Sequence, residues 1–353
     1  MRAALLYGKE DLRVEDLPVP EIGAEEVLLQ VKAAAICGTD IRMYRNGAKG
    51  VGPQSPLVLG HELSGMVARV GRGVHGVQGP AEGDRVAVAP NMGCGTCNAC
   101  VSGNTHFCEN GYRAFGINLP GGFAEFVLIP AEAVRQGNLC ALSPEVSFAA
   151  AALAEPLSCV FNAFQRCAIR PGDQVLIIGA GPIGLMHAKL ARMGGAGRIF
   201  LNDLSAERLE DCRRHEPELV TIPGADPAAQ VLSMTGGKGL DVVITACPAP
   251  EAQVTALKVA AVNGRVVFFG GLPADRAVVP LDTNLIHYRQ LMVTGTARSS
   301  LSQFRQVLQL IAGGLVRVDE LVSARWPLES IGEAFQTVMR ASGLKHVVSF
   351  EGK

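Results

Sequence analysis

The sequence has no run that approaches the ~20 apolar residues of a membrane-spanning helix, and its most apolar stretches are short and bounded by Gly or Pro. Its N-terminal stretch, "MRAALLYGKEDLRVEDLPVP", reaches charged residues too early to supply the apolar core of a signal peptide. The formal net charge is -1, which offers no basic surface for nucleic acid or an anionic membrane. We therefore expect a soluble, cytoplasmic protein whose partner is a small molecule.

The length and the apolar content bound the number of domains. A chain of 353 residues suggests about two domains, since one domain takes roughly 100 to 200 residues, and 48% apolar residues suffice for real cores. The organisation of the sequence changes near residue 150. Before it, short strands are separated by Gly, Pro and Asp, as in "EVLLQVKAAAIC", "ELSGMVARVG", "DRVAVAP" and "FAEFVLIP". This first part is predicted to be an irregular β-rich domain.

After residue 150, apolar strand-like runs alternate with helical patterns. The predicted strands are "QVLIIGA", "RIFLND", "ELVTIP", "DVVITAC", "GRVVFFGG" and "LMVTGTA", and helices lie between the first five. Six buried strands with helical crossovers indicate an α/β domain with a doubly wound parallel sheet. From about 297 to 353, helical and strand patterns are mixed again, with the helix "LSQFRQVLQLIAGG" and the strands near "LVSARWPL" and "HVVSF".

Four of the ten cysteines lie within "CGTCNACVSGNTHFC", at positions 94, 97, 100 and 108. A disulfide framework is excluded because it belongs to short chains in oxidising compartments. In a reducing cytosol, the cluster of Cys94, Cys97, Cys100 and Cys108 indicates a tetrahedral thiolate site for structural zinc, in a lobe at about 90–110. Four free thiols are one alternative. An iron–sulfur cluster is another, although the ferredoxin pattern continues with x3-Cys-Pro and this one does not.

The first unit of the predicted parallel sheet carries "GAGPIG", directly after a strand and directly before a helix. Gly179 permits the sharp turn, Gly181 lets a pyrophosphate approach the backbone, and Gly184 allows the helix to pack closely on the strand. Asp203, at the end of the second strand, is suited to bind ribose hydroxyls and would repel a 2'-phosphate, which favours NAD over NADP. The predicted cofactor-binding residues are Gly179, Gly181, Pro182, Ile183, Gly184, Asp203 and Arg208.

Further metal-binding residue types are spread over the first domain and beyond it. Cys37 lies in "ICGTD", His61 and Glu62 lie in "GHE", and Glu155 lies in "AEPLSC". Taken singly, each has an ordinary structural explanation as a buried thiol, a core histidine or a helix-start acid. Together with the cysteine lobe and the glycine motif, in this order and spacing, they resemble the zinc-dependent medium-chain dehydrogenases over essentially the whole chain. The similarity is greatest to the sorbitol (polyol) and threonine dehydrogenase branch.

The resemblance implies a fold and a set of metal ligands. It implies a GroES-like catalytic domain made of residues 1–150 and 297–353, with a Rossmann NAD-binding domain, 151–296, inserted between them. It also implies a catalytic zinc held by Cys37 and His61, with Glu62 and Glu155 completing the ligand set in one state or another. Relatives in this branch use a carboxylate in place of a second cysteine, at the position of Glu155. Which of the two carboxylates binds the resting metal is left open by the sequence.

The resemblance further implies hydride transfer from an alcohol carbon to NAD, with Thr39 placed to take the hydroxyl proton. Many relatives have a histidine three residues after this position, but the chain has Arg42, and an arginine cannot deprotonate at ordinary pH. A proton relay would therefore end in water or in another group. Tyr44, Phe115 and Arg298 fall in segments that line the substrate cleft of relatives and are predicted substrate contacts.

The predicted function is NAD-dependent, zinc-dependent oxidation of a secondary alcohol of a polyol, cyclitol or sugar alcohol to a ketone. Oxidation of a threonine-type amino alcohol is the nearest alternative. A non-catalytic dinucleotide-binding protein is a further alternative, since fold does not fix function and the relay histidine is missing. The resemblance also implies a homodimer or a homotetramer.

Overall fold

A computed structural model describes residues 1–74 and 79–350, and the chain divides into two compact units. The first unit consists of Met1–Ser158 and Ser299–Lys353, and the second of Cys159–Arg298. The first division falls inside helix α5 (Ala154–Cys167), so the helix continues through it. The boundaries predicted at 150 and 297 lie a few residues before these limits, and the first of them precedes α5.

The first unit is built mainly from antiparallel strands. Its strands are β1 (Arg2–Gly8), β2 (Asp11–Asp16), β3 (Val27–Ala35), β4 (Leu57–Val58), β5 (Glu62–Val70), β6 (Arg85–Val88), β7 (Asn91–Met92), β8 (Arg113–Ala114), β9 (Phe126–Ile129), β10 (Leu139–Ala141), β17 (Val322–Trp326) and β18 (Lys345–Ser349). Besides α5, its helices are α1 (Gly38–Asn46), α2 (Asn98–Val101), α3 (Ala131–Gln136), α4 (Phe148–Ala152), α11 (Leu301–Ala312) and α12 (Ile331–Met339). The predicted β-rich domain is confirmed.

The largest sheet of this unit joins the two ends of the chain. Its seven strands run in the order β10-β6-β5-β3-β18-β17, and β9 pairs with β3 beside this path. Strand β18, from the C-terminal tail, pairs antiparallel with the end of β3, which in turn pairs with β5. Residues more than 280 positions apart in the sequence are therefore neighbours in one sheet, as the Lys345–Glu62 pair illustrates.

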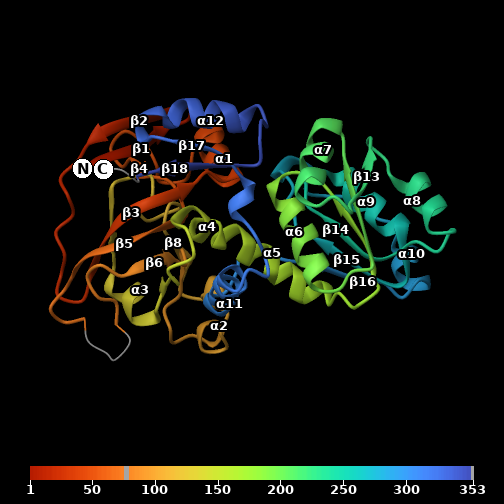
Figure 1. Cartoon of the computed structure of the whole chain (residues 1–353), viewed down its shortest axis with the longest axis horizontal. Helices are drawn as coiled ribbons and strands as arrows, with labels where there is room; N and C mark the ends of the chain where they lie inside the picture. Colours follow the sequence, from red (N-terminus) through yellow and green to blue (C-terminus); the bar gives the residue numbers. More distant parts are fainter. Residues whose placement is uncertain (75–78, 351–353) are drawn as a thin grey trace. The chain divides into compact units, whose positions relative to one another are not determined.

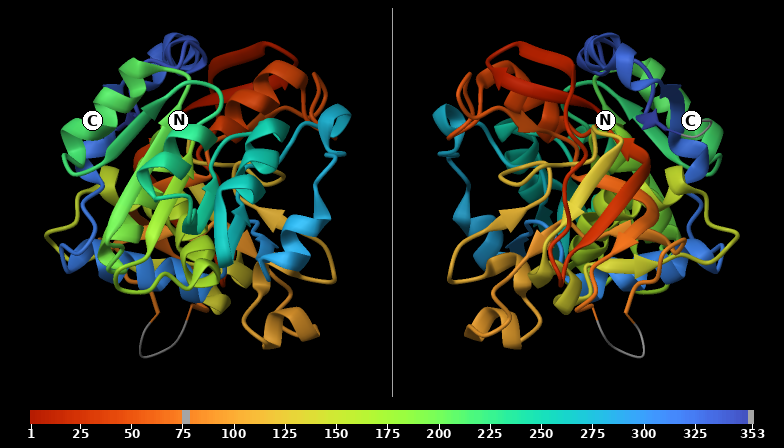
Figure 2. Two further views of the ribbon diagram at one scale, coloured as in Figure 1. Left: turned by 90° about the vertical axis from the view of Figure 1, so that its right-hand side faces the viewer. Right: turned by 90° about the vertical axis from the view of Figure 1, so that its left-hand side faces the viewer.

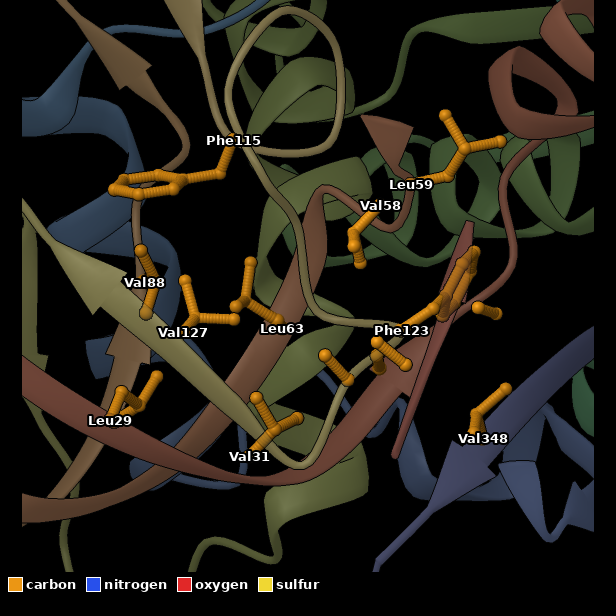
Figure 3. Close-up of a cluster of buried hydrophobic side chains, with 14 of the residues drawn as sticks. Leu29, Val31, Val58, Leu59, Leu63, Val88, Phe115, Phe123, Val127 and Val348 are labelled. Atoms are coloured by element: carbon orange, nitrogen blue, oxygen red, sulfur yellow. The ribbon is translucent and has the colours of Figure 1, made fainter. Parts of the chain in front are cut away.

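The core of the first unit lies on one face of this sheet. Leu29, Val31, Leu63, Val88 and Val127 come from four different strands and point toward one another in Figure 3. Leu29 and Val31 are two residues apart in β3, so their side chains lie on the same face of the sheet, because successive side chains of a strand point to opposite sides.

The second unit contains one parallel sheet with helices between its strands. Its elements are β11 (Gln174–Ile178), α6 (Pro182–Met193), β12 (Arg198–Asp203), α7 (Ala206–His215), β13 (Val220–Pro223), α8 (Ala228–Met234), β14 (Leu240–Thr245), α9 (Pro250–Val259), β15 (Ala260–Phe268), α10 (Thr283–Tyr288) and β16 (Met292–Gly295). The strand order is β13-β12-β11-β14-β15-β16, and every pairing is parallel.

This order is that of a dinucleotide-binding sheet, with the first strand in the middle and the direction of winding reversed beside it. Figure 1 shows α6 and α9 on opposite sides of the sheet. The predicted doubly wound parallel sheet is confirmed, and each of the six predicted strands forms. Within the described residues, no helix combines the length and the apolar character that a membrane span requires.

Candidate metal centres and nucleotide site

The four cysteines of the lobe converge on one point. The sulfur atoms of Cys94, Cys97, Cys100 and Cys108 all lie within 4.8 Å of one another, with Sγ–Sγ separations of 4.0 Å for Cys94–Cys100 and 3.9 Å for Cys97–Cys108. A regular tetrahedron with Zn–S bonds of about 2.3 Å has sulfur–sulfur edges of about 3.8 Å. The observed separations therefore fit a zinc ion bound by four thiolates.

Short local elements bring these sulfurs together. Cys97 is the N-cap of α2, Cys100 lies within that helix, and Cys108 follows a single 3-10 turn. Gly93 is required by packing, because a Cβ atom there would lie 2.4 Å from the Cys100 sulfur. Figures 1 and 2 show the lobe with α2 and helix α12 at opposite ends of the first unit. The lobe is thus a locally built feature at the edge of its unit.

The surroundings of the sulfurs favour thiolates at the exposed end of the lobe. Hydrogen bonds from the Thr96 hydroxyl and from the backbone N–H groups of Thr96 and Cys97 lower the pKa of Cys94 to about 5. Backbone hydrogen bonds also lower the pKa of Cys97, whereas burial raises the pKa of Cys100 to about 12. A metal ion would remove that conflict, because a bound cation holds a coordinating thiol in its deprotonated form.

A second group of metal-ligating side chains consists of Cys37, His61 and Glu62. One ligand atom from each lies within 4.8 Å of the other two. Cys37 follows the end of β3 and is the N-cap of α1, where its backbone N–H donates to Asp40 at 2.8 Å. His61 and Glu62 stand at the start of β5, and Ala35 of β3 pairs with Glu62, so the ladder sets the two chain segments side by side.

The turn before His61 depends on Gly60. This glycine has φ +93°, a conformation that an L side chain rarely adopts, and a Cβ atom there would lie 2.9 Å from the ring of Phe123. His61 then lies with Nδ1 3.5 Å from Oδ1 of the buried Asp40. Ligand histidines usually donate from their second ring nitrogen to a carboxylate, and Asp40 is the carboxylate next to Nδ1 here, although the contact is too loose to count as a hydrogen bond among the described residues.

The charges around His61 and Glu62 are buried. Burial by itself lowers the pKa of His61, but the charges of Asp40 and Cys37 outweigh it and raise the pKa well above its ordinary value. Glu62 is fully buried, and its Oε2 accepts a hydrogen bond from Lys345 Nζ at 2.5 Å. Its Oε1 has no hydrogen-bond partner within the described part of the chain. A buried carboxylate oxygen without a donor suits a cation, so this group also fits a metal ion.

Glu155, the other predicted carboxylate, lies in the first turn of α5 and is 8% exposed. Among the described residues, the group that could hold an ion contains Glu62 and not Glu155. The structure therefore brings together Cys37, His61 and Glu62, and a metal-binding role for Glu155 stays a prediction.

Of the remaining predicted residues of the first unit, Thr39 and Tyr44 lie in α1 and Phe115 follows β8. Thr39, in its first turn, is half-buried, and its Oγ1 lies 3.5 Å from Nη2 of the exposed Arg42. Tyr44 packs edge-on against Phe335, with ring centroids 5.6 Å apart. Phe115 is a core residue, 1% exposed and packed within the cluster of Figure 3, and its contact with a substrate stays a prediction.

The glycine motif forms the turn between β11 and α6 in the second unit. Gly179 has φ +116°, and a Cβ atom on Gly184 would lie 1.8 Å from the Gly179 carbonyl oxygen. Gly181 is different: it is the N-cap of α6, and no described atom lies within 4 Å of a Cβ atom built there. The open space at Gly181 and the positive end of a 12-residue helix that begins with Pro182 and Ile183 are the features that bind a pyrophosphate.

Asp203 ends β12 and lies beside this turn. Its carboxylate accepts hydrogen bonds from the backbone N–H of Ala180 at 2.7 Å and of Ser205 at 2.9 Å. Arg208 lies in the first turn of α7, where its backbone N–H donates to the N-cap hydroxyl of Ser205. Arg298, the last residue of this unit, has φ +59°, and its carbonyl accepts a hydrogen bond from Asn162 at 3.0 Å.

Sequence reasoning missed Lys345 and the part played by Asp40. Lys345 lies at the start of β18, 283 positions from Glu62, and no local motif surrounds it. The one signal was a lysine that opens a run of apolar residues in the C-terminal tail, which does not by itself identify its partner.

Comparison with known proteins covers both units. Residues 23–137 match the family model described as the alcohol dehydrogenase GroES-like domain, and residues 182–313 match the one described as zinc-binding dehydrogenase. The chain is 31% identical over 342 residues to sorbitol dehydrogenase of Bacillus subtilis (strain 168), covering 96% of this chain and 94% of that protein. It is 34% identical over 355 residues to L-threonine 3-dehydrogenase of Pyrococcus abyssi (strain GE5 / Orsay), covering 99% and 97%.

Solved structures of similar proteins superpose on nearly the whole chain. An alcohol dehydrogenase from Thermus sp. ATN1 superposes with a TM-score of 0.89 at 30% identity, covering 99% of each chain. A Sinorhizobium meliloti 1021 protein solved with NADP gives a TM-score of 0.86 at 29% identity, covering 99% of this chain and 98% of the other.

Proposed function

Since the chain belongs to the zinc-dependent medium-chain dehydrogenases, in the branch that contains sorbitol and threonine dehydrogenases, we propose that it oxidises a secondary alcohol to a ketone with NAD. The observation that carries this proposal is the buried group of one thiol, one imidazole and one carboxylate formed by Cys37, His61 and Glu62. Three protein ligands leave a position open for a further ligand, as in catalytic zinc sites, whereas the four-cysteine lobe would be closed.

Cys37, His61 and Glu62 would hold a catalytic zinc ion in the first unit. When bound, zinc supplies a Lewis acid that makes an alcohol more acidic, and NAD supplies the hydride acceptor. The carboxylate of Asp40 lies 3.5 Å from Nδ1 of His61, within ion-pair distance. Cys94, Cys97, Cys100 and Cys108 would hold a second, structural zinc.

Thr39 is the residue that we assign to the proton of the substrate hydroxyl. It lies two residues from Cys37, at the start of α1, and its side chain is half-buried. Arg42 is a permanent donor and can steady the Thr39 oxygen, but it cannot pass a proton on. Because Arg42 is exposed, we propose that the proton leaves from Thr39 to solvent.

The nucleotide site of the second unit favours NAD. Gly181 and the start of α6 offer space and N–H groups for the pyrophosphate, while Asp203 places a negative charge where NADP would carry its 2'-phosphate. The Sinorhizobium meliloti relative was solved with NADP, so both cofactors should be assayed. Arg208, in the first turn of α7, is the cationic residue that would reduce this preference for NAD over NADP.

We propose a polyol, a cyclitol or a sugar alcohol as the substrate, because relatives that match over nearly the whole chain are named sorbitol dehydrogenase and D-xylulose reductase. The threonine side chain is the second candidate, because relatives that are 33% and 34% identical to the chain are named L-threonine 3-dehydrogenase. Steady-state NAD reduction with sorbitol, xylitol, inositols, tetritols and threonine separates the two. Turnover confined to threonine would overturn the polyol assignment.

A non-catalytic dinucleotide-binding protein is the alternative from another class. It predicts NAD binding without turnover of any alcohol in the panel, and NAD binding that does not change in Cys37→Ser or Glu155→Ala.

We further propose a cytoplasmic protein that works as a homodimer or a homotetramer. All ten cysteines are free thiols, in keeping with a reducing compartment. Light scattering of the purified protein would test the oligomeric state.

A further inference from the structure

Lys345 stands beside the Cys37–His61–Glu62 group and belongs to none of the sequence motifs. Its Nζ donates to Glu62 Oε2 at 2.5 Å and to the backbone carbonyl of Ile36 at 2.9 Å. The side chains of Lys345 and Glu62 are 5% and 0% exposed. One ammonium group therefore holds a candidate ligand, Glu62, and the residue that precedes another candidate ligand, Cys37.

The sheet fixes this position from three strands. Lys345 is the first residue of β18, and the backbone N–H of Ile36 donates to the carbonyl of the adjacent His346 at 2.9 Å. The last residue of β3, Ala35, pairs with Glu62 on its other side. Because β18, β3 and β5 are consecutive in the sheet, the Lys345 side chain has only to cross the end of β3 to reach Glu62.

The two oxygens of Glu62 have different surroundings. Oε2 accepts a hydrogen bond from Lys345, whereas Oε1 is buried without a hydrogen-bond partner among the described residues. A ligand atom of Glu62 lies within 4.8 Å of those of Cys37 and His61. We propose that Lys345 is a positioning residue of the metal centre, which anchors Glu62 through Oε2 and leaves Oε1 as the oxygen that faces the metal.

This role rests on the proposed function, since it presumes that Cys37, His61 and Glu62 hold a metal ion. It assigns Glu62 as a ligand through a single oxygen, with its orientation set by the C-terminal strand. Partners that orient metal ligands typically change metal affinity by about 10- to 100-fold when they are replaced. A purely structural ion pair would change the stability of the first unit and leave the metal centre as it was.

The chain supplies a matched control for the structural reading. In the second unit, Lys189 Nζ lies 3.2 Å from Oε1 of Glu216, with side chains 6% and 17% exposed, and Nε of Arg192 lies 3.3 Å from Oε2 of the same carboxylate. Replacing Lys189 with Met removes a buried ammonium group from an ion pair that contains no candidate metal ligand. Both lysine replacements should lower thermal stability, but only the one at Lys345 should alter the metal centre.

The test uses the full chain with zinc kept in the four-cysteine lobe and cobalt(II) introduced at the other centre. The visible d–d absorption of cobalt reports its coordination, and competition with a chromophoric chelator reports its affinity. We expect Lys345→Met to change the absorption bands and to weaken cobalt binding about 10- to 100-fold. We expect Lys345→Arg, which keeps the cation, and Lys189→Met to retain the wild-type bands and an affinity within about threefold.

A Lys345→Met protein with wild-type bands and affinity would overturn the positioning role. If that variant does not fold, Lys345→Ala, which removes both the donor and the charge, takes its place under the same criterion. The variant Cys37→Ser separates this outcome from failure of the proposed function. Cobalt bands that survive Cys37→Ser would mean that the metal does not bind there at all, whereas bands lost in Cys37→Ser and kept in Lys345→Met would overturn the role of Lys345 alone.

Discussion

The two candidate metal centres of the first unit are built in opposite ways. The lobe takes its four sulfurs from one stretch of fifteen residues, 94–108, and it needs only a short helix, a 3-10 turn and small residues to converge. The other centre takes Cys37 from the end of β3, His61 and Glu62 from the start of β5, and its supporting Lys345 from β18. The first centre is local, and the second is assembled by strand pairing.

The difference teaches what each centre can do. A loop that surrounds a metal ion with four thiolates leaves no position for a substrate and can only fix its own conformation. A centre assembled across three strands is held by the rigid core of the sheet and can leave one position open. Its candidate ligands also have charged neighbours: Lys345 donates a hydrogen bond to Glu62, and Asp40 lies within ion-pair distance of His61. We therefore assign chemistry to the assembled centre and structural support to the lobe.

The largest effect that this comparison predicts is that of Cys37→Ser. Loss of a direct ligand should exceed the 10- to 100-fold effect of outer partners, so we expect kcat/KM to fall more than about 100-fold. The metal content of the protein should fall by one ion per chain, with the lobe still loaded. Steady-state assays and metal analysis of the same preparation check this, and an activity within about tenfold of wild type would remove the distinction between the two centres.

A smaller loss is expected for Thr39→Val, which deletes the hydroxyl but no metal ligand. General acid–base groups contribute about 10²- to 10⁴-fold, and we expect kcat to fall about 100-fold with the metal content unchanged. Thr39→Ser keeps the hydroxyl and should stay within about threefold of wild type. Equal losses in both variants would assign the effect to packing at the start of α1 and not to proton transfer.

Two glycines of the second unit extend the comparison to the nucleotide site. Gly181→Ala adds a methyl group where the protein leaves open space, so it should fold normally and weaken NAD binding about tenfold, a cost of about 1.4 kcal/mol. Gly184→Ala places the same group 1.8 Å from a backbone oxygen and should lower the melting temperature. Titration of NAD and thermal unfolding distinguish them, and unchanged NAD binding by Gly181→Ala would argue against a pyrophosphate at this turn.

The smallest effect on activity is expected for Cys108→Ser, in the lobe. We expect loss of one metal ion and a melting temperature lower by at least about 5 °C, which corresponds to about 2 kcal/mol in a domain of this size. The kcat/KM of the molecules that remain folded should stay within about threefold of wild type. A loss of activity as large as that of Cys37→Ser, at a temperature where the variant is folded, would place the lobe in the reaction.

The same contrast between local and assembled features explains what could be predicted from the sequence. The lobe and the glycine motif could be predicted because the residues of each are contiguous in the sequence. The parallel sheet could be predicted because apolar strands alternate with helices. Cys37, His61 and Glu62 were recognised through the order of several motifs and not through spacing alone. Whether Glu62 or Glu155 joins the group could not be read, because it depends on the pairing of β3 with β5.

Lys345 and Phe115 show the limit of local patterns. The sequence around Lys345 is that of an ordinary buried strand, and its role follows from the order of β5, β3 and β18 in the sheet. Phe115 is predicted as a substrate contact from its segment, and the sequence does not indicate that its side chain is also buried in the core. In both cases, the property depends on which strands become neighbours, and a single sequence without strand partners does not contain that information.

The most direct test of this account is the zinc content of the purified protein during timed chelation, measured together with NAD reduction by a panel of polyols. The account predicts about two zinc ions per chain, of which one leaves first, and a loss of activity that follows the loss of that ion. It also predicts that the ion retained longer is the one that Cys108→Ser removes. A single zinc ion that resists chelation, in a protein that turns over no alcohol, would contradict the assembled centre as the site of reaction.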